Sequence, residues 1–341
     1  MTLDPITIVG GGAWGTALAV NLGGRAIPIR LWMNEPELVR RMDERRDNPV
    51  YLPGIQVPRT VTPTNDLAAA LEATSLVVFA VPTPFARGVY DAMRGALPAS
   101  VPLVIATKGI EEETLLLPTE VATACLSAAT PVAAISGPSF AEEVARGIPT
   151  VAVLAARDPA LARGVRDRLS GTTLRLYTNA DVVGVQVAAA LKNVVAIAAG
   201  IVDGLGFGHN TIAALVTRGL AEMRRLGVAL GGSPETFSGL AALGDLVLTC
   251  TGGLSRNRRV GQALGRGERI ADITAGMKHV AEGVRTTRSA RALAARAGVE
   301  MPIVEEVHRI LYEDGDPRQA VLRLMTRPLG AEDRDGAGEP A

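Results

Sequence analysis

Short apolar runs and amphipathic stretches alternate along the first half of the chain. The runs are rich in β-branched residues and predict strands, whereas the stretches between most of them repeat apolar residues at helical spacing. Strands are predicted at Ile6–Val9, Ile27–Trp32, Leu76–Ala80, Leu103–Ala106, Val132–Ile135, Val151–Leu154 and Thr173–Tyr177. Helices are predicted at residues 14–24, 36–46, 66–73, 85–96, 114–128, 139–146 and 158–169. This alternation is typical of a mainly parallel sheet with helices on both faces.

The second half of the chain is predicted to be helical, because no strand pattern follows Asn179. Glycine and proline separate the helical stretches. The stretches lie at Asp181–Val202, Asn210–Leu230, Ser238–Cys250, Ser255–Leu264, Ile270–Ala275, Thr286–Ala297 and Val304–Tyr312. The tail after Arg327 is rich in Gly, Asp, Glu and Pro, a composition that predicts disorder.

The first predicted strand ends in the glycine motif Gly10-x-Gly12-x-x-Gly15, and a helical pattern begins at once. In this context Gly10 permits a tight turn, Gly12 lets the backbone approach a pyrophosphate, and Gly15 lets the helix pack closely. The free N–H groups at the helix N-terminus then face the phosphates. The alternative is an α/β protein whose glycine-rich turn binds no nucleotide.

These patterns predict two domains in a chain of 341 residues. Residues 1–180 are predicted to form an α/β, Rossmann-type dinucleotide-binding domain. Residues 181–327 are predicted to form an all-α domain that binds the substrate and carries the catalytic groups, and residues 328–341 form the disordered tail. A ligand cleft is expected between the two domains.

The composition narrows the class of function. Lys and Arg total 35, and Asp and Glu also total 35, so no net charge indicates binding to nucleic acid or to an anionic membrane. Cys125 and Cys250 lie in apolar contexts, as the reduced core cysteines of a cytoplasmic protein do. A strand begins near the N-terminus, and no signal peptide is expected. Lys192 and Asn193 interrupt the apolar stretch Val185–Val202, which favours a buried helix over a membrane span.

Lys192 is the sharpest candidate for a catalytic group. The residues three and four positions away are all apolar: Ala188, Ala189, Val195 and Ala196. Burial lowers the pKa of a lysine and makes it usable as a general base. Asp245 lies among apolar residues and is its natural partner, with Thr249 on the same helical face one turn later. The alternatives are a lysine that extends to the surface and a structural salt bridge between Asp245 and an arginine.

A second candidate site is the turn that contains Ser255, Arg256 and Asn257. Ser255 is predicted to cap a helix, which places Arg256 and Asn257 in the first turn. A cation there opposes the helix dipole unless an anion binds, and arginine suits a phosphate. The alternative is a solvated basic turn.

Three strand ends supply further candidates for the ligand site: one strand ends in a turn at Pro82, Lys108 follows a second, and Gly137 and Ser139 follow a third. Lys108 could equally be a solvated loop lysine. The histidines are His209, His279 and His308, and their spacing does not favour a metal site.

Together these segments resemble the NAD(P)-dependent glycerol-3-phosphate dehydrogenases in their bacterial form, over nearly the whole chain. The motifs that carry the resemblance are Gly10-x-Gly12-x-Trp14-Gly15-Thr16, Thr107-Lys108-Gly109, Ser136-Gly137-Pro138-Ser139-Phe140-Ala141, Leu191-Lys192-Asn193-Val194, Gly204-x-Gly206-Phe207-Gly208, Thr217-Arg218-Gly219, Leu243-Gly244-Asp245-Leu246, Ser255-Arg256-Asn257-Arg258 and Glu282-Gly283.

The resemblance implies roles for individual residues. Lys192 matches the proton acceptor, and Asp245 is expected to assist it. Substrate contacts are expected at Lys108, Gly137, Ser139, Lys192, Asn193, Asp245, Thr249, Ser255, Arg256 and Asn257. Cofactor contacts are expected at Gly10, Gly12, Ala13, Trp14, Gly15, Asn34, Lys108, Ala141, Arg256, Val280 and Glu282.

Two departures from the family bear on the choice of cofactor. The family commonly has Ser at the position of Ala13, and often has Arg or His where Met33 and Asn34 stand. A carboxylate about twenty residues past the glycines would favour NAD. Met33 and Asn34 supply no carboxylate at that position, and Glu35 lies slightly beyond it in the sequence. We therefore expect NADP, or dual use of NAD and NADP.

The resemblance implies reversible hydride transfer between glycerol 3-phosphate and NAD(P), giving dihydroxyacetone phosphate and serving phospholipid synthesis. We also expect a cytoplasmic homodimer. Two alternatives stay open: another β-hydroxyacid-type dehydrogenase, and a non-catalytic sensor of the nicotinamide redox state. The sensor would not explain Lys192, Asp245 and a separate phosphate-like turn.

Overall fold

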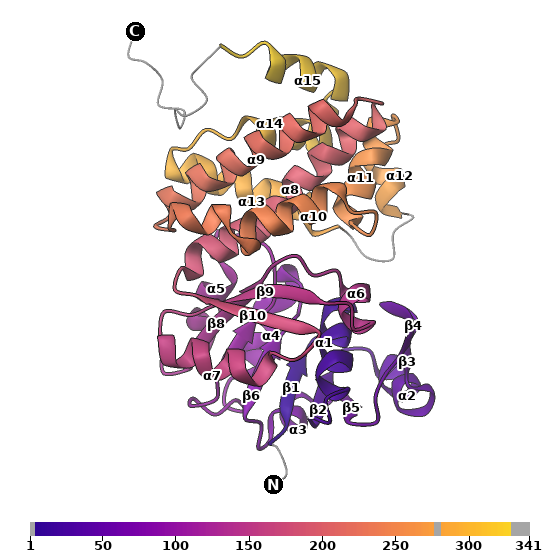
Figure 1. The fold of residues 1–341 in the computed structure, drawn as a ribbon, viewed down its shortest axis with the longest axis vertical. Coiled ribbons are helices and arrows are strands. Elements are labelled where there is room, and N and C mark those ends of the chain that lie inside the picture. Colours follow the sequence, from indigo (N-terminus) through magenta and orange to yellow (C-terminus); the bar gives the residue numbers. More distant parts are fainter. Residues whose placement is uncertain (1–3, 276–280, 329–341) are drawn as a thin grey trace. The chain divides into compact units, whose positions relative to one another are not determined.

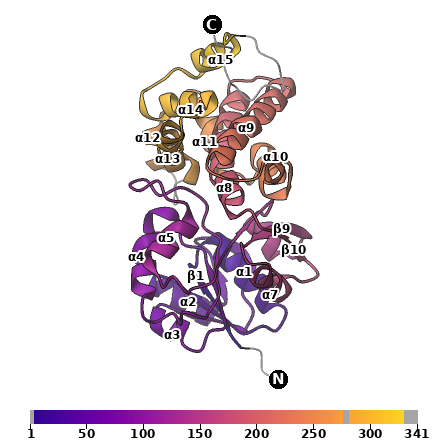
Figure 2. The same cartoon turned by 90° about the vertical axis from the view of Figure 1, so that its left-hand side faces the viewer.

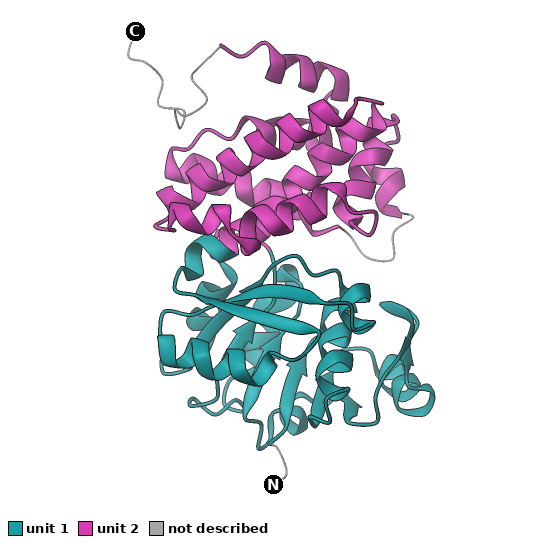
Figure 3. Cartoon of the chain, in the orientation of Figure 1, with its two compact units in different colours: residues 1–108, 116–185 teal, residues 109–115, 186–341 magenta. Residues whose placement is uncertain are grey.

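The computed structural model describes residues 4–275 and 281–328. By internal contacts the chain forms two compact units (Figure 3). Unit 1 contains residues 1–108 and 116–185, and unit 2 contains residues 109–115 and the chain from residue 186 onward. The loop 109–115 is therefore grouped with the second unit although its flanks belong to the first.

Unit 1 is built on a sheet whose strands run in the order β10-β9-β8-β7-β6-β1-β2-β5. The strands are β1 (Ile6–Val9), β2 (Ile29–Trp32), β5 (Val61–Thr64), β6 (Leu76–Phe79), β7 (Leu103–Ile105), β8 (Val132–Ser136), β9 (Thr150–Ala155) and β10 (Leu174–Asn179). Neighbouring strands are parallel except β8 and β9, which are antiparallel. The predicted mainly parallel sheet is confirmed.

Helices cover both faces of this sheet (Figures 1 and 2). They are α1 (Ala13–Gly23), α2 (Pro36–Arg45), α3 (Leu67–Leu71), α4 (Thr83–Met93), α5 (Pro118–Cys125), α6 (Ala141–Ala145) and α7 (Pro159–Leu169). Ile6 and Ile8 face a core that includes α1, α6 and α7, whereas Val9 faces a second core with α3, α4 and α5. Side chains alternate across a strand, so one β-branched run supplies both cores.

Three strands of unit 1 were not predicted. A two-stranded antiparallel ribbon pairs β3 (Asp47–Asn48) with β4 (Leu52–Gln56), and β5 forms the edge of the main sheet. β3 has only two residues, both polar, and proline or glycine interrupts β4 and β5, so none of the three shows the apolar alternation that identifies a strand. The predicted helix at residues 114–128 was also too long, because α5 begins at Pro118.

Unit 2 is helical within the described residues, as predicted. Its elements are α8 (Val182–Gly204, whose first turn belongs to unit 1), α9 (His209–Ala229), the 3-10 helix η1 (Pro234–Ser238), the π-helix η2 (Leu240–Gly244), α10 (Asp245–Thr251), α11 (Arg256–Gly265), α12 (Ile270–Ala275), α13 (Glu282–Ala297), α14 (Pro302–Tyr312) and α15 (Pro317–Met325). By length and composition α8 could cross a membrane, but its apolar window is entirely buried in the protein, as in a core helix.

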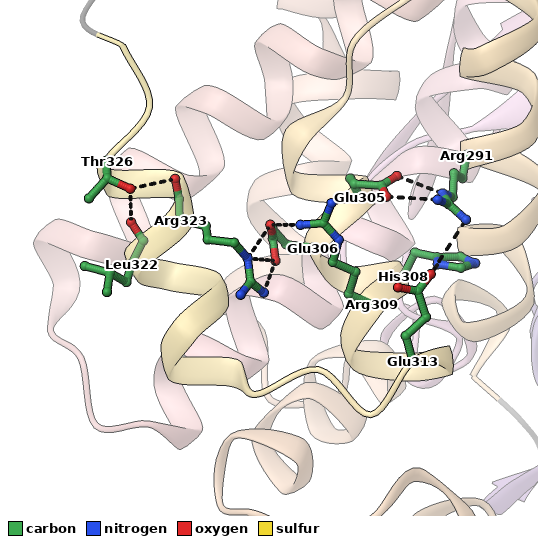
Figure 4. Close-up of polar contacts among 9 residues, drawn as sticks. All are labelled: Arg291, Glu305, Glu306, His308, Arg309, Glu313, Leu322, Arg323 and Thr326. Atoms are coloured by element: carbon green, nitrogen blue, oxygen red, sulfur yellow. Dashed lines mark hydrogen bonds and ion pairs between the residues drawn. The ribbon is translucent and has the colours of Figure 1, made fainter.

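Two expectations for unit 2 need correction. The predicted single helix Ser238–Cys250 is split into η1, η2 and α10, and α15 was not predicted at all. Only Ala320 of α15 is buried, so the helix has almost no apolar face to signal it. Charge attaches α15 to α14 instead, because Arg323 donates two N–H groups to the carboxylate of Glu306 on α14 (Figure 4). Arg309, which lies on α14 itself, donates a third N–H to the same carboxylate.

Candidate functional site

The centre of unit 2 is the crossing of α8 and α11, which is lined by glycines from both helices. A Cβ built on Gly200 would lie 2.0 Å from the Arg258 carbonyl oxygen, and one on Gly261 would lie 2.0 Å from the Ile197 carbonyl oxygen. No side chain fits at either position, so the two backbones touch. This close approach brings the polar residues of α8 beside those of α11.

Lys192 on α8 forms a buried polar cluster with α10. Its Nζ donates to Asp245 Oδ1 at 2.5 Å and to Thr249 Oγ1 at 3.1 Å. Thr249 Oγ1 in turn donates to the Asp245 carbonyl oxygen at 2.6 Å. All three residues are buried. The predicted partners are therefore in contact, and the two hydrogen bonds hold Nζ at one fixed place.

The backbone before Asp245 is irregular. The π-helix η2 ends at Gly244, and Asp245 is the first residue of α10. A single π-turn inside a helical segment is often found at a functional position, because it re-aims the side chains that follow. Cys250 also lies on α10, and burial raises the pKa of its thiol to about 12. The thiol stays protonated there and offers no nucleophile.

A chain of hydrogen bonds joins Gly283, Asn257 and Asn193. The Gly283 N–H donates to Asn257 Oδ1 at 2.9 Å, and Asn257 Nδ2 donates to Asn193 Oδ1 at 2.9 Å. A backbone N–H can only donate, so the orientation of both amides is determined. Asn193 Nδ2 is then left as a buried donor with no partner among the described residues. A buried unpaired donor is costly, and a bound ligand would satisfy it.

Ser255 caps α11 as predicted, because its Oγ accepts from the Arg258 N–H at 3.2 Å. Arg256 follows at the first helical position and is exposed. Arg258 has a structural role, since its Nη2 donates to Asp203 Oδ2 at 3.0 Å. The helix start therefore presents the exposed Arg256 next to the backbone N–H groups of the first turn, an arrangement that suits an anion.

The glycine turn of unit 1 has the geometry that the motif predicts. Gly10 has φ +116°, a conformation that favours glycine, and a Cβ on Gly15 would lie 1.9 Å from the Gly10 carbonyl oxygen. A Cβ on Gly12, by contrast, would meet no atom within 4 Å. Gly12 thus lies at an open surface at the start of α1, where a phosphate can approach the backbone.

The residues near the end of β2 bear on the cofactor. Asn34 is exposed there. The carboxylate of Glu35 accepts a hydrogen bond from the Tyr51 hydroxyl at 2.7 Å. Burial is the larger cause and the Glu35 carboxylate the second, and together they raise the pKa of Tyr51 to about 12. The Tyr51 hydroxyl therefore keeps its proton and remains a hydrogen-bond donor to Glu35. Glu35, the acid next to Asn34 in the sequence, therefore already accepts a hydrogen bond from Tyr51. The sequence did not indicate Tyr51.

The other predicted residues of unit 1 lie at its strand ends and helix starts. Ala13 and Ala141 are the first residues of α1 and α6, and Lys108 follows β7 by three positions. Gly137 has φ +148° and accepts a hydrogen bond on its carbonyl from Ser139 Oγ at 2.8 Å. In unit 2, Glu282 is the first residue of α13. Val280 lies outside the described residues.

The residues of unit 1 fit a dinucleotide. Gly12 leaves an open approach to the backbone, and the Trp14 Nε1, one residue into α1, is buried with no hydrogen-bond partner among the described residues. The open backbone at Gly12 offers room and N–H donors for a phosphate, and the unpaired ring N–H of Trp14 is a further donor in the same helix start.

Comparison with known proteins covers nearly the whole chain. Residues 5–162 match the family model described as the NAD-dependent glycerol-3-phosphate dehydrogenase N-terminus, and residues 181–322 match the model of its C-terminus. A glycerol-3-phosphate dehydrogenase (NAD(P)+) of Geobacter sulfurreducens is 50% identical over 331 residues, which are 96% of this chain and 99% of that protein. The enzyme of the same name from Koribacter versatilis is 50% identical over 334 residues, 97% and 99% of the two chains. The crystal structure of glycerol-3-phosphate dehydrogenase from Coxiella burnetii has a TM-score of 0.91 at 41% identity and covers 96% of this chain and 100% of that one.

Proposed function

The chain belongs to the NAD-dependent glycerol-3-phosphate dehydrogenase family, and we propose on that basis that it interconverts glycerol 3-phosphate and dihydroxyacetone phosphate with NAD(P). The buried contact between Lys192 and Asp245 carries the proposal that the chain is an active enzyme. A redox sensor would need no such pair. The product glycerol 3-phosphate would supply phospholipid synthesis.

Lys192 is the proposed general base. In its neutral form it takes the proton of the C2 hydroxyl as that carbon is oxidised, and as an ammonium it returns the proton to the carbonyl oxygen in the reverse direction. The bound nicotinamide supplies the hydride chemistry. Asp245 and Thr249 keep Nζ in one position. This supports proton transfer between Nζ and the substrate oxygen in one fixed geometry.

The substrate contacts are proposed within each unit. In unit 2, Ser255, Arg256 and Asn257 at the start of α11 would bind the phosphate, and the unpartnered Asn193 Nδ2 would donate to a substrate oxygen. In unit 1, the proposed contacts are Lys108, Gly137 and Ser139. Positioning of the reacting carbon by several such contacts can lower the barrier by several kcal/mol, an order-of-magnitude effect of orientation.

The cofactor contacts are proposed as the sequence suggested them: Gly10, Gly12, Ala13, Trp14, Gly15, Asn34, Lys108, Ala141, Arg256, Val280 and Glu282. The exposed amide of Asn34, together with the engagement of Glu35 by Tyr51, supports use of NADP or of both cofactors. Residues 1–180 would then be the dinucleotide-binding domain and residues 181–327 the substrate-binding and catalytic domain.

We further propose a cytoplasmic homodimer. The buried free thiols of Cys125 and Cys250 support a reducing compartment. Gel filtration with light scattering measures the assembly, and a mass equal to one chain would overturn it.

One assay tests the activity. The purified protein should oxidise NADH or NADPH when dihydroxyacetone phosphate is added, followed by the absorbance of the reduced nicotinamide. Dihydroxyacetone without phosphate should react far more slowly, because the phosphate contacts are lost. Absence of turnover with both cofactors would overturn the proposal, and turnover with a β-hydroxyacid instead would assign the chain to the alternative reaction.

A further inference from the structure

The carbonyl of Gly11 is held by two side chains from distant parts of unit 1. Asn48 Nδ2, on the short strand β3, donates to the Gly11 carbonyl oxygen at 2.9 Å. Thr16 Oγ1, on α1, donates to the same oxygen at 3.0 Å, and Asn48 Nδ2 also lies 2.9 Å from Thr16 Oγ1. Asn48 is 1% exposed and Thr16 is fully buried.

The orientation of the Asn48 amide is itself determined. Its Oδ1 accepts from the Tyr51 N–H at 3.2 Å, and a backbone N–H can only donate. The Nδ2 end must therefore face the Gly11 carbonyl, which can only accept. The ribbon formed by β3 and β4 supplies this anchor.

A planar trans peptide points its C=O and N–H in opposite directions. Because the Gly11 carbonyl points toward Asn48 and Thr16, the N–H of Gly12 points away from them. Gly12 is the N-cap residue of α1, and a Cβ built on it would meet no atom within 4 Å. If this peptide rotated by half a turn, the Gly11 carbonyl would face the phosphates and repel them.

Nothing in the local sequence prevents that rotation. Gly10, Gly11 and Gly12 follow one another, and a peptide flanked by glycines has no Cβ to restrict it. Contacts from outside the turn must therefore choose between the two orientations.

We propose that Asn48 is a positioning residue for cofactor binding: it locks the Gly11–Gly12 peptide with its N–H toward the pyrophosphate of NAD(P). The inference rests on the proposed function, since it takes the dinucleotide as the ligand. Thr16 supports the same orientation, because its hydroxyl also donates to the Gly11 carbonyl oxygen. Asn48 acts through the backbone and touches no reacting atom.

The test is direct binding measured by calorimetry. Asn48→Ala should weaken NADH, NADPH and ADP-ribose by about ten-fold or more, because an N–H donated to a charged phosphate is lost. Adenosine, which has no pyrophosphate, should bind as it does to the wild type. At saturating cofactor, kcat should stay close to the wild-type value.

Asn21→Ala is the matched control. Asn21 is also a buried asparagine of unit 1, on α1, and its Nδ2 donates to Thr173 Oγ1 at 3.0 Å, away from the turn. It should lower the melting temperature without weakening any of the ligands. Should Asn48→Ala fail to fold, Thr16→Val removes the other bond to Gly11, and it should weaken ADP-ribose while Thr16→Ser does not.

Three results would overturn the inference. They are wild-type affinity of Asn48→Ala for ADP-ribose, an equal loss for adenosine and ADP-ribose, and the same loss in Asn21→Ala. A wild-type protein that binds neither NADH nor NADPH would instead overturn the proposed function.

Discussion

Lys192 Nζ lies 2.5 Å from Asp245 Oδ1, and the two side chains are only 7% and 1% exposed. Desolvating two ionisable groups costs several kcal/mol, which their mutual attraction offsets only when the geometry is good. In proteins generally, replacing a buried ion pair by apolar residues of similar volume is often neutral or stabilising. The pair is therefore best explained by what it does to a ligand.

Replacing Lys192 by alanine should lower kcat by ~10²–10⁴, the usual contribution of a general acid–base group. The affinity for NADH should change little, because Lys192 is not one of the proposed cofactor contacts. Steady-state kinetics and a binding titration measure the two quantities. An alanine variant that keeps more than about a tenth of wild-type turnover would contradict the assignment.

Replacing Arg256 by alanine should raise KM for dihydroxyacetone phosphate about 10–150-fold, since a hydrogen bond to a charged group contributes ~1.5–3 kcal/mol. Arg259→Ala is the control, because Arg259 is an exposed arginine three positions further along α11. It should leave KM almost unchanged. Equal KM values for the two variants would mean that Arg256 does not bind the phosphate.

Asn34→Asp should shift the preference toward NADH. The new carboxylate can accept from the ribose hydroxyls and repels a 2′-phosphate, and like charges in contact can cost several kcal/mol. The ratio of kcat/KM for the two cofactors measures the shift, with Asn34→Ala as the uncharged control. A wild type that already strongly prefers NADH, together with an unaltered Asp variant, would show that Glu35 reads the ribose despite its bond to Tyr51.

Stability should fall as pH rises from 4.5 to 7, because of Glu222. Burial raises the pKa of this carboxyl from 4.5 to about 7, although the N–H groups of Ile303 and Val304, and the charges of Arg225 and Arg218, act in the opposite direction. The folded state therefore holds a proton that the unfolded state has lost. This contribution is complete below pH 4.5 and is lost as pH rises through 7, by roughly 3 kcal/mol.

Urea unfolding across this pH range measures the effect. Glu222→Gln keeps an oxygen for the Ile303 N–H, which donates to Glu222 Oε1 at 2.8 Å, and should remove the pH dependence. Glu300→Gln changes an exposed acid and should preserve it. A Gln variant with the wild-type pH profile would exclude Glu222 as the cause.

Hydrophobic periodicity predicted most of the fold because most elements bury one regular face. β1 and α1 are found where the pattern placed them, within a residue or two. The method failed where burial is irregular or replaced by charge. β4 contains Pro53 and Gly54, and α15 is attached through Arg323 rather than through apolar residues.

Some residues of the candidate site could be predicted from the sequence, and others could not. The contact between Lys192 and Asp245 was predicted, because a charged residue in an apolar helix is visible in the sequence itself. Asn48 was not, because its importance depends on a contact with Gly11, thirty-seven positions away. The direction of the unpartnered Asn193 amide likewise depends on Asn257 and Gly283, and no pattern within a single helix contains that information.

The glycine crossing of α8 and α11 ties the geometry of the proposed substrate contacts to the tightness of helix packing. Gly200 and Gly261 let the backbones touch, and the bond between Asn257 and Asn193 spans that same crossing. A collapsed intermediate with formed helices but loose packing would show the native far-ultraviolet circular dichroism while this bond is still open. We therefore expect turnover to recover only with the final tightening of side chains, so that helix content alone would be a poor measure of how much of the protein is active.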